Sequence, residues 1–373
     1  MRVFVVIGTR PEAIKMLPLV RELRKYGEFE TKICFSGQHK EMARSVFEEF
    51  EIEPDFVFED LKIGLDLRKL TAELLNYFDV VFAREKPDLV LVHGDTTTAF
   101  CGALAAFYLG IEVAHIEAGL RTFDCRSPFP EEFNRVAIDG LADIHFAPTK
   151  IAAENLIKEG RKSVFTVGNT VIDALKDSLS SGVCTPILNE LDGRKLVLVT
   201  THRRENLGEK MRSSLLGIRD ALCERDDLFA ILPAHPNPRV REVVQEVFKN
   251  IKNIKICEPL PMREFHKLLS YAFVVFSDSG GIQEEAAYLG VPLFLMREKT
   301  ERRECLGLSN MELVGWQREV IKNEFTAFLN DDSRQKRMRV PSTVFGDGHA
   351  SEKIVRCLLD LLKSDNRGRV CPS

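Results

Sequence analysis

Residues 274–286 read Val-Val-Phe-Ser-Asp-Ser-Gly-Gly-Ile-Gln-Glu-Glu-Ala, an apolar run typical of a buried strand that passes directly into a helical pattern. The turn Ser279-Gly280-Gly281 would place backbone N–H groups, and the positive end of a helix dipole, at the carboxyl end of that strand. Glycine lets a ligand approach the backbone closely, and Glu285, one turn into the helix, could accept hydrogen bonds from ribose hydroxyls. A plain strand-to-helix turn would look similar, so the rest of the chain must decide between a phosphate site and a structural turn.

Short apolar runs like this one alternate with helical patterns along the chain. We expect strands at Val3–Ile7, Lys32–Phe35, Leu89–Val92, Val113–Ile116, Ile144–Ala147, Val164–Val167, Leu196–Thr200, Phe229–Leu232, Ile254–Cys257, Phe273–Phe276 and Pro292–Leu295. Because these runs are continuously apolar, they indicate strands covered on both faces, as in parallel sheets with right-handed crossovers. They are too many for one comfortable open sheet, so the sequence predicts an α/β protein of two Rossmann-like domains with a cleft between them.

The length of 373 residues also fits two domains. We expect the N-terminal domain to span residues 1–167 and the C-terminal, nucleotide-binding domain to span residues 168–348. An amphipathic helix over residues 349–363 would return to join the N-terminal domain.

Composition excludes several classes of protein. With 52 basic and 56 acidic side chains the net charge is −4, which argues against a nucleic-acid surface that depends on bulk charge. The chain has no apolar run near the ~20 residues of a membrane span and no signal-peptide pattern, so we expect a cytoplasmic protein without nucleic-acid or membrane partners. Its 9 cysteines form no C-x-x-C pair, which favours free thiols over disulfides or a metal site.

Several familiar catalytic motifs are missing from the sequence. It lacks a P-loop, a G-x-G-x-x-G turn after a strand, H-E-x-x-H, D-x-D and a G-x-S-x-G elbow. This argues against NTPases, dinucleotide dehydrogenases, zinc hydrolases, metal-dependent sugar-nucleotide transferases and serine hydrolases. We therefore expect no metal and no cofactor.

Two cations follow the first predicted strand. Arg10 and Lys15 lie beside a helix start that Pro11 favours. Positive side chains at the positive end of a helix dipole are unfavourable, so we expect an anionic partner; a solvated helix N-terminus is the alternative.

Three acidic residues follow other strand ends in the same half: Asp95, Glu117 and Glu131. Asp95 could simply cap the helix predicted through Ala99–Leu109, and Glu131 could complement a helix dipole. Carboxylates brought together at one sheet edge would repel one another and split their pKa values, which is how acid and base roles are separated. The three together therefore favour a catalytic site.

Polar residues also follow the strands of the second half. His202 comes directly after a strand and could donate to a phosphate or a leaving oxygen, or could be a structural histidine. His235 lies in a proline-rich loop and could contact a ligand or only orient that loop. Arg302 belongs to a cationic segment after the last predicted strand. With the Ser279–Gly281 turn, this arrangement suits a nucleotide-diphosphate sugar.

Seven ordered motifs match one family: Gly-Thr-Arg-Pro-Glu-Ala at 8–13, Gly-Gln-His at 37–39, His-Gly-Asp-Thr at 93–96, His-Ile-Glu-Ala-Gly-Leu-Arg at 115–121, Pro-Glu-Glu-Phe-Asn-Arg at 130–135, Thr-His-Arg-Arg-Glu-Asn at 201–206 and Asp-Ser-Gly-Gly-Ile-Gln-Glu-Glu-Ala at 278–286. From residue 1 to about residue 363, the chain resembles the non-hydrolysing UDP-N-acetylglucosamine 2-epimerases. Hydrolysing relatives would read Gly-Gly-Glu at Ala118-Gly119-Leu120. The resemblance implies the glycosyltransferase-B fold, a homodimer, a role in polysaccharide biosynthesis, and interconversion of UDP-N-acetylglucosamine and UDP-N-acetylmannosamine by elimination and re-addition of UDP via 2-acetamidoglucal.

The resemblance also implies roles for individual residues. The catalytic set would be Asp95, Glu117, Glu131 and His202. The residues that bind the UDP-sugar substrate would be Arg10, Lys15, Arg135, Phe265, Ser279, Gly280, Gly281, Glu285 and Arg302. A second UDP-sugar could bind as an allosteric activator at Gln38, His39 and His235.

Other activities stay open on sequence grounds. A 2-epimerase of a UDP-diacetamido-uronic acid would need a cation for the C6 carboxylate, which Arg121 or Arg135 could supply. A sugar transferase of the glycosyltransferase-B fold would share the nucleotide half but would not need three acids around C2. A non-catalytic nucleotide-sugar sensor is disfavoured because the catalytic set is complete.

Overall fold

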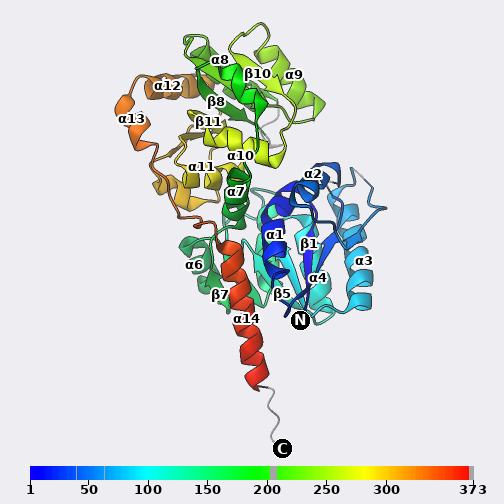
Figure 1. The fold of residues 1–373 in the computed structure, drawn as a ribbon. Coiled ribbons are helices and arrows are strands. Elements are labelled where there is room, and N and C mark those ends of the chain that lie inside the picture. The colour runs from blue at the N-terminus through cyan, green and yellow to red at the C-terminus, as the bar shows by residue number, and fades with distance from the viewer. Residues whose placement is uncertain (39, 63, 202–207, 369–373) are drawn as a thin grey trace, which may run out of the picture. The chain divides into compact units, whose positions relative to one another are not determined.

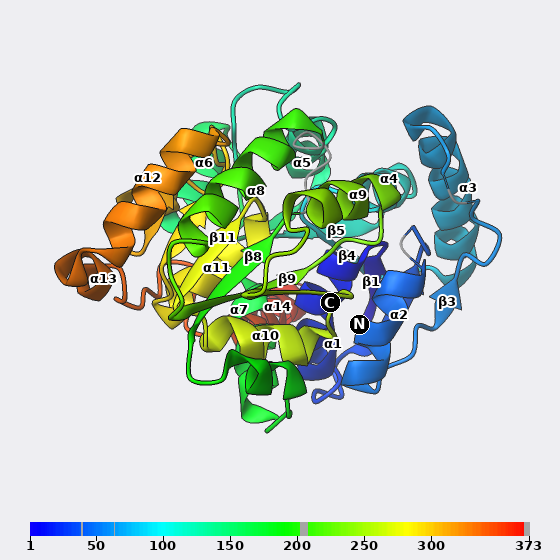
Figure 2. The same cartoon turned by 90° about the horizontal axis from the view of Figure 1, so that it is seen from above.

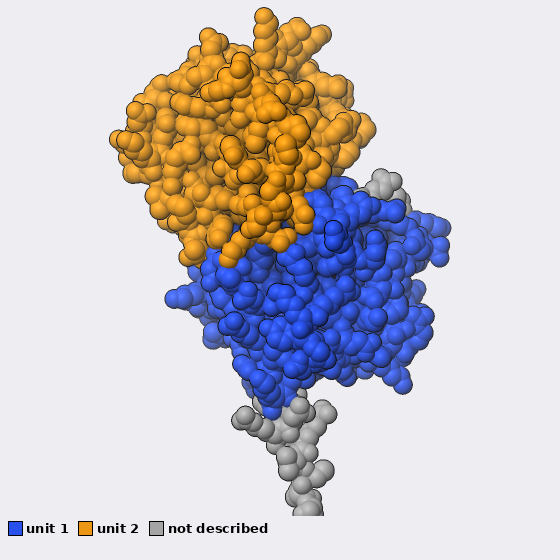
Figure 3. Space-filling model, in the orientation of Figure 1, with its two compact units in different colours: residues 1–174, 346–373 blue, residues 175–345 orange. Residues whose placement is uncertain are grey.

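The computed structural model describes residues 1–38, 40–62, 64–201 and 208–368. The chain forms two compact units, Met1–Ala174 with Gly346–Ser373, and Leu175–Phe345 (Figure 3). The boundaries expected from sequence fall after residues 167 and 348, whereas the first crossing lies inside helix α7 (Thr170–Ser180). The sequence of α7 has an uninterrupted helical pattern, so it does not indicate that the boundary between the two units lies inside this helix.

The first unit is built on a parallel sheet, of which β1, β5 and β7 are labelled in Figure 1. Among the described residues this sheet has seven strands, in the order β3-β2-β1-β4-β5-β6-β7. Its strands are β1 (Arg2–Ile7), β2 (Glu30–Phe35), β3 (Phe56–Val57), β4 (Leu89–His93), β5 (Glu112–Ile116), β6 (Ile144–Ala147) and β7 (Val164–Thr166). The direction of winding reverses between β1 and β4, where the connecting loops diverge. Ligands of open α/β sheets bind at such a point, beyond the carboxyl ends of the strands.

Helices cover both faces of this sheet (Figure 2). On one face pack α3 (Leu67–Glu85), α4 (Thr97–Tyr108) and α5 (Glu131–Leu141). On the other pack α1 (Arg10–Leu23), α2 (Lys40–Phe50) and α14 (Ala350–Gly368), and α6 (Lys150–Lys158) contacts β6 and β7. Apolar side chains of α3 and α4, among them Phe78 and Phe82, fill the core against β1 and β4.

The second unit repeats the same strand order. In the described residues its parallel sheet has six strands, ordered β10-β9-β8-β11-β12-β13. These strands are β8 (Lys195–Thr200), β9 (Leu228–Pro233), β10 (Ile254–Cys257), β11 (Val274–Ser277), β12 (Leu293–Leu295) and β13 (Met311–Leu313). The helices in the described part of this unit are α8 (Glu209–Leu222), α9 (Pro238–Val247), α10 (Met262–Ser270), α11 (Gly280–Leu289), α12 (Arg318–Leu329) and α13 (Asp332–Arg337), with 3₁₀ segments η1 (Pro186–Leu191) and η3 (Arg303–Gly307). Its core packs α8, α9 and α12 against the sheet.

The predicted α/β class with two Rossmann-like parallel sheets is confirmed. Every predicted strand is present, with ends that shift by a few residues. The sequence analysis missed β3 and β13, which are short edge strands without a continuous apolar run. The described part of the chain contains no helix that is both long and apolar enough to cross a membrane.

Candidate active site

Acidic and basic residues meet at the carboxyl edge of the first sheet. Arg10 opens α1 directly after β1, and Asp95 and Glu117 follow β4 and β5. These three strands are neighbours in the sheet, so the loops after them are adjacent. A Cβ atom on Gly94 would lie 3.5 Å from Glu117 Oε1, which brings the Glu117 carboxylate against the loop that carries Asp95.

Glu117 is buried and held by several polar side chains. Its Oε2 atom pairs with Lys15 Nζ and accepts a hydrogen bond from Asn169 Nδ2, and it lies 3.8 Å from His93 Nε2. The backbone of Glu117 has a φ of 64°, in the left-handed region that side chains other than glycine rarely adopt. The sequence analysis expected an anionic partner for Lys15, and the structure supplies one from the chain itself.

Asp95 faces helix α5. Thr96 caps α4, because its Oγ1 accepts a hydrogen bond from Ala99 N–H at 3.0 Å. The alternative in which Asp95 caps that helix is therefore wrong. Asn134 Nδ2 donates to the Asp95 carbonyl oxygen at 2.8 Å, and Arg135 Nε lies 3.5 Å from Asp95 Oδ2.

Arg135 is among the largest of the fully buried side chains, with an exposed fraction of 1%. Its Nη2 atom lies 3.5 Å from Glu132 Oε2, while Glu132 Oε1 accepts the backbone N–H groups of Thr122 and Phe123 at 2.8 and 2.9 Å. The sequence analysis expected Arg135 at the substrate. The structure places its guanidinium between the carboxylates of Asp95 and Glu132.

Glu131 opens α5 and is half-buried. Residues three and four positions apart share a face of a helix, so Glu131 lies on the side of α5 that carries Asn134 and Arg135 toward the Asp95 loop. Asp95, Glu117 and Glu131 thus all follow strands at the carboxyl edge of the first sheet, and Arg10 and Lys15 lie in the first half of the helix that follows the neighbouring strand β1.

Glu12 is a site residue that the sequence analysis missed. Its Oε2 atom accepts hydrogen bonds from the N–H groups of Gly8 and Thr9 at 3.0 and 2.7 Å, and its Oε1 atom accepts one from Thr96 Oγ1 at 2.6 Å. Glu12 therefore ties the loop after β1 to the cap of α4. The spacing Thr9-x-x-Glu12 is a capping box, a signal that could have been found in the sequence.

Glu12 should make stability depend on pH. Burial raises the pKa of this carboxyl from 4.5 to about 7, although its hydrogen-bond donors oppose the shift. Because the unfolded chain loses this proton at lower pH than the folded chain, the stabilisation is full below pH 4.5 and is lost as the pH rises through about 7. We expect the stability of the wild type relative to Glu12→Gln to fall by roughly 3 kcal/mol across that window. Urea unfolding at several pH values measures this, with the exposed Glu28→Gln as control; parallel pH profiles for wild type and Glu12→Gln would contradict it.

The second unit presents a helix start at the end of β11. Helix α11 begins at Gly280, and its N-cap residue Ser279 makes no side-chain capping hydrogen bond. The Arg302 guanidinium lies against this start, since a Cβ atom on Gly280 would be 2.8 Å from Arg302 Nη1. Arg302 is held there by ion pairs with Glu284 and, at 2.6 Å, with Glu301. A cation and a helix dipole thus act at one point, which favours an anion.

Glu285 and Phe265 come from neighbouring helices in the same unit. Glu285 Oε1 lies 3.3 Å from His266 Nε2, and His266 Nδ1 is 2.8 Å from Ser178 Oγ. Phe265 adjoins His266 on α10. No sequence pattern predicts a role for His266, because a buried histidine inside an amphipathic helix carries no local signal.

The remaining predicted residues are placed only in part. His202 and His39 lie outside the described residues. Gln38 Oε1 accepts a hydrogen bond from Thr98 Oγ1 at 2.9 Å, at the carboxyl edge of the first sheet. In the second unit, His235 Nδ1 accepts the Asn237 N–H at 3.1 Å. This contact agrees with the prediction that His235 orients the proline-rich loop, which was one of two alternatives beside ligand contact.

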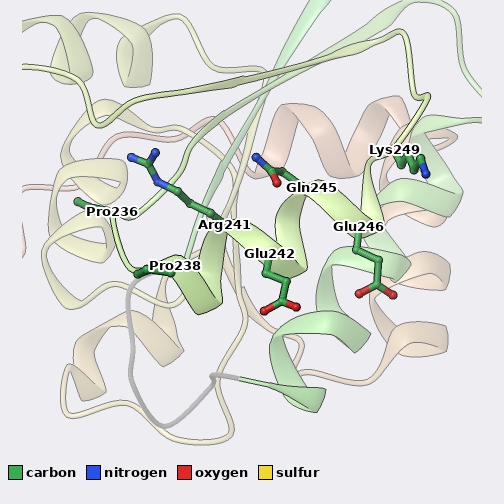
Figure 4. Close-up of a pocket in the computed structure, with 7 residues that line it drawn as sticks. All are labelled: Pro236, Pro238, Arg241, Glu242, Gln245, Glu246 and Lys249. Carbon is green, nitrogen blue, oxygen red and sulfur yellow. The ribbon is translucent and has the colours of Figure 1, made fainter.

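A surface hollow of about 810 Å³ runs along α9 (Figure 4). It is lined by Pro236, Pro238, Arg241, Glu242, Gln245, Glu246 and Lys249. Most of its charged side chains lie on the outer face of α9, and none of the predicted site residues lines it. We therefore assign the chemistry to the sheet edges and not to this hollow.

The protein has two Rossmann-like parallel sheets, and its structural neighbours share this glycosyltransferase-B-like α/β fold. Comparison with known proteins narrows the class. The family model described as UDP-N-acetylglucosamine 2-epimerase matches residues 21–359. The chain belongs to this family of isomerases.

Individual relatives agree with this assignment. The UDP-N-acetylglucosamine 2-epimerase of Bacillus subtilis is 44% identical over 361 residues, which cover 96% of this chain and 95% of that protein. The crystal structure of UDP-GlcNAc 2-epimerase from Neisseria meningitidis bound to UDP-GlcNAc superposes with a TM-score of 0.92 at 40% identity, covering 96% of this chain and all of that one. The Methanocaldococcus jannaschii enzyme in complex with UDP-GlcNAc and UDP gives a TM-score of 0.84 at 35% identity, with 96% and 100% covered.

Proposed function

We propose that this protein interconverts UDP-N-acetylglucosamine and UDP-N-acetylmannosamine. The proposal is supported by the positions of Asp95, Glu117 and Glu131, which all follow strands at the carboxyl edge of one sheet, and by relatives at about 40% identity that are UDP-N-acetylglucosamine 2-epimerases. Three acids are more than nucleotide binding needs. They suit a reaction that moves a proton and stabilises a developing cation.

The chemistry of the sugar explains this need. The hydrogen on C2 is not acidic in the ground state, because no carbonyl stands next to it in the ring. Weakening of the C1–O bond gives C1 oxocarbenium character, which makes the neighbouring C2 proton acidic. A carboxylate then accepts that proton, the C2–H electron pair forms the C1=C2 bond of 2-acetamidoglucal, and the C1–O pair leaves with UDP.

Re-addition reverses these steps with inversion at C2. A UDP oxygen attacks C1, and a proton is delivered to the opposite face of C2. Microscopic reversibility requires an acid–base group on each face of the ring, so at least two of the three acids take that role and another can stabilise C1. Glu117 suits proton transfer, since Lys15 and Asn169 fix its carboxylate in one orientation.

The second unit holds the departing UDP in this account. The start of α11 and Arg302 bind the diphosphate, Glu285 binds ribose and Phe265 lies at uracil, while Arg10 and His202 stabilise the charge that develops on departure. His266 orients Glu285 through its 3.3 Å contact. A preorganised donor at such a position is typically worth ~3 kcal/mol, about a hundredfold in rate.

The uronic-acid alternative loses its support in the structure. Arg121 is buried and engaged by Asp139 and Glu159, and Arg135 is buried between Asp95 and Glu132. Neither of these two cations is exposed to meet a C6 carboxylate.

The proposed epimerase activity is tested by incubation with UDP-N-acetylglucosamine, followed by proton NMR of the anomeric region. We expect signals of the manno epimer to grow to equilibrium, whereas free UDP with transferred or hydrolysed sugar, and no manno epimer, would contradict the proposal.

Gly280→Ala should weaken UDP binding. The new Cβ atom would lie 2.8 Å from Nη1 and 3.2 Å from Cζ of Arg302, a side chain that two ion pairs hold in place. Either the guanidinium or the helix start must move, so we expect the dissociation constant of UDP to rise by ~10-fold or more. Isothermal titration calorimetry measures it. Gly307→Ala, where no neighbouring atom lies within 4 Å, is the control, and an equal affinity in both variants would count against this role of Arg302.

We also propose a cytoplasmic homodimer that serves polysaccharide biosynthesis. Phe107 and Tyr108 at the end of α4, and Phe133 on α5, are large aromatic side chains that the single chain leaves exposed. Aromatic residues are enriched at interfaces between subunits. Light scattering should give twice the chain mass of 42.3 kDa, and Tyr108→Glu should shift it toward the monomer. A wild-type monomer would contradict the assembly.

A further inference from the structure

A buried charge cluster lies behind the loops that carry Asp95 and Glu117. It consists of His115 on β5, Arg121 in the loop after β5, and Asp139 on α5. The exposed fractions of these side chains are 0%, 2% and 0%. The mechanism proposed above uses none of the three, so the cluster needs its own explanation.

Asp139 is the centre of the cluster. Its Oδ1 atom lies 2.6 Å from His115 Nδ1, while its Oδ2 atom lies 2.7 Å from Arg121 Nη2 and accepts the Gly119 N–H at 3.2 Å. Burial alone would raise the pKa of the Asp139 carboxyl, but the charges and hydrogen bonds of His115 and Arg121 outweigh burial and hold that pKa below its ordinary value. Asp139 is therefore a carboxylate that accepts from three donors.

His115 connects this carboxylate to the other loop. Its second ring nitrogen, Nε2, lies 2.7 Å from the Gly94 carbonyl oxygen. A carboxylate and a carbonyl oxygen only accept, so both hydrogen bonds form only when each ring nitrogen carries a proton. Asp139 balances the resulting imidazolium charge, as Glu159 balances the charge of Arg121 at 2.7 Å.

A second histidine lies beside this ring. His145 is the register partner of His115 on β6. Its ring nitrogens lie 3.0 Å from the Asp139 carbonyl oxygen and 3.1 Å from the Lys162 carbonyl oxygen. It contacts the backbone of Asp139 and not its carboxylate, so it does not compete with His115.

The two backbone groups that the cluster binds adjoin candidate catalytic residues. Gly94 immediately precedes Asp95, and Gly119 lies two residues after Glu117. The left-handed φ of 64° at Glu117 is strained for a side-chain-bearing residue and persists only where its surroundings fix it. At Gly119, with a φ of 86°, a Cβ atom would lie 2.3 Å from the Ala152 carbonyl oxygen, so the loop has no room to shift on that side.

We propose that Asp139 and doubly protonated His115 are positioning residues for epimerisation. Asp139 fixes the loop after Glu117 through Gly119 N–H, and His115 fixes the loop before Asp95 through the Gly94 carbonyl oxygen. The Asp139 carboxylate thereby fixes the positions of the Asp95 and Glu117 carboxylates relative to each other. This inference rests on the proposed function and adds residues to it that do not touch the sugar.

Two substitutions of His115 separate positioning from general structural support. The side-chain amide of Gln can reach the place of Nε2 and keep the donor to the Gly94 carbonyl, whereas that of Asn can replace only Nδ1. We expect kcat to fall ~100-fold in His115→Asn and far less in His115→Gln, because a displacement of about 1 Å can cost that factor. KM and the UDP dissociation constant should stay unchanged in both. Equal kcat values in the two variants, or a loss confined to KM, would overturn the proposal.

The wild type provides a test that does not depend on how the variants fold. Nitrogen-15 NMR of the protein labelled at histidine should show a proton on both ring nitrogens of His115, with His115→Gln used to assign the signals. A ring with one unprotonated nitrogen would overturn the proposal. Failure of the proposed function would show separately, as a wild-type protein that makes no manno epimer.

Discussion

Replacing Glu117 by Gln is expected to lower turnover by ~10³-fold, the range that general acid–base catalysis supplies. Gln keeps the shape of the side chain but cannot accept the C2 proton, and it removes the negative charge that Lys15 meets. The residues proposed to bind the diphosphate, ribose and uracil of UDP belong to the other unit, so the dissociation constant of UDP should change little. Steady-state epimerisation kinetics and UDP titration measure the two quantities.

The matched control for this variant is Glu112→Gln, which alters an exposed carboxylate at the start of the same strand. It should retain wild-type turnover. Asp95→Asn and Glu131→Gln should also be strongly impaired. Near-normal rates in all three acid variants would remove the acids from the mechanism, and loss in Glu117→Gln alone would contradict the requirement for an acid–base group on each face of the ring.

Arg135→Met is expected to destabilise the first unit and to impair catalysis together. Removing one partner of a buried charge pair costs ~3–5 kcal/mol, because the other charge stays buried without compensation. Glu132 is that partner, with an exposed side-chain fraction of 1%. For a unit of this size the loss corresponds to a fall in the unfolding midpoint on the order of 10 °C. Asp95 also loses its cation, at 3.5 Å, so kcat should fall even where the variant is folded.

Differential scanning calorimetry and kinetics below the unfolding midpoint measure both effects. Arg126→Met, which removes an exposed arginine from the loop before α5, is the control and should change neither. An unchanged midpoint in Arg135→Met would mean that Glu132 does not depend on this guanidinium. A lower midpoint with unchanged kcat would mean that Arg135 does not orient Asp95.

Much of the fold could be predicted because most of its strands are uninterrupted apolar runs in the sequence. Buried parallel strands such as β4 and β11 are uninterrupted apolar runs, and helical patterns separate them, so strand identity and sheet type follow from local sequence. The strand β3, only two residues long and half-buried, carries no comparable signal. Edge strands of this kind depend on a neighbour for their definition.

Candidate site residues could be predicted where position along the chain suffices. Asp95 and Glu117 follow strands directly, and residues after parallel strands share one edge of the sheet. Their partners could not be predicted in the same way. Lys15 and Glu117 are 102 positions apart, and Glu12 and Thr96 are 84 apart, so these contacts exist only through the strand order and register.

The role proposed for His115 could not be predicted from the sequence. It lies within an apolar strand, where a polar residue reads as an exception to the pattern. Its role becomes visible only when α5 brings Asp139 to one ring nitrogen and β4 brings the Gly94 carbonyl to the other. Neither contact is encoded in the motif that surrounds it.

The central claim is that acids of the first unit move the C2 hydrogen while UDP departs and returns. The most direct measurement is the fate of that hydrogen when the enzyme epimerises UDP-N-acetylglucosamine in D₂O. The account predicts that deuterium appears at C2 of the manno product and, on longer incubation, of the recovered gluco substrate. A manno epimer that retains hydrogen at C2 would contradict it.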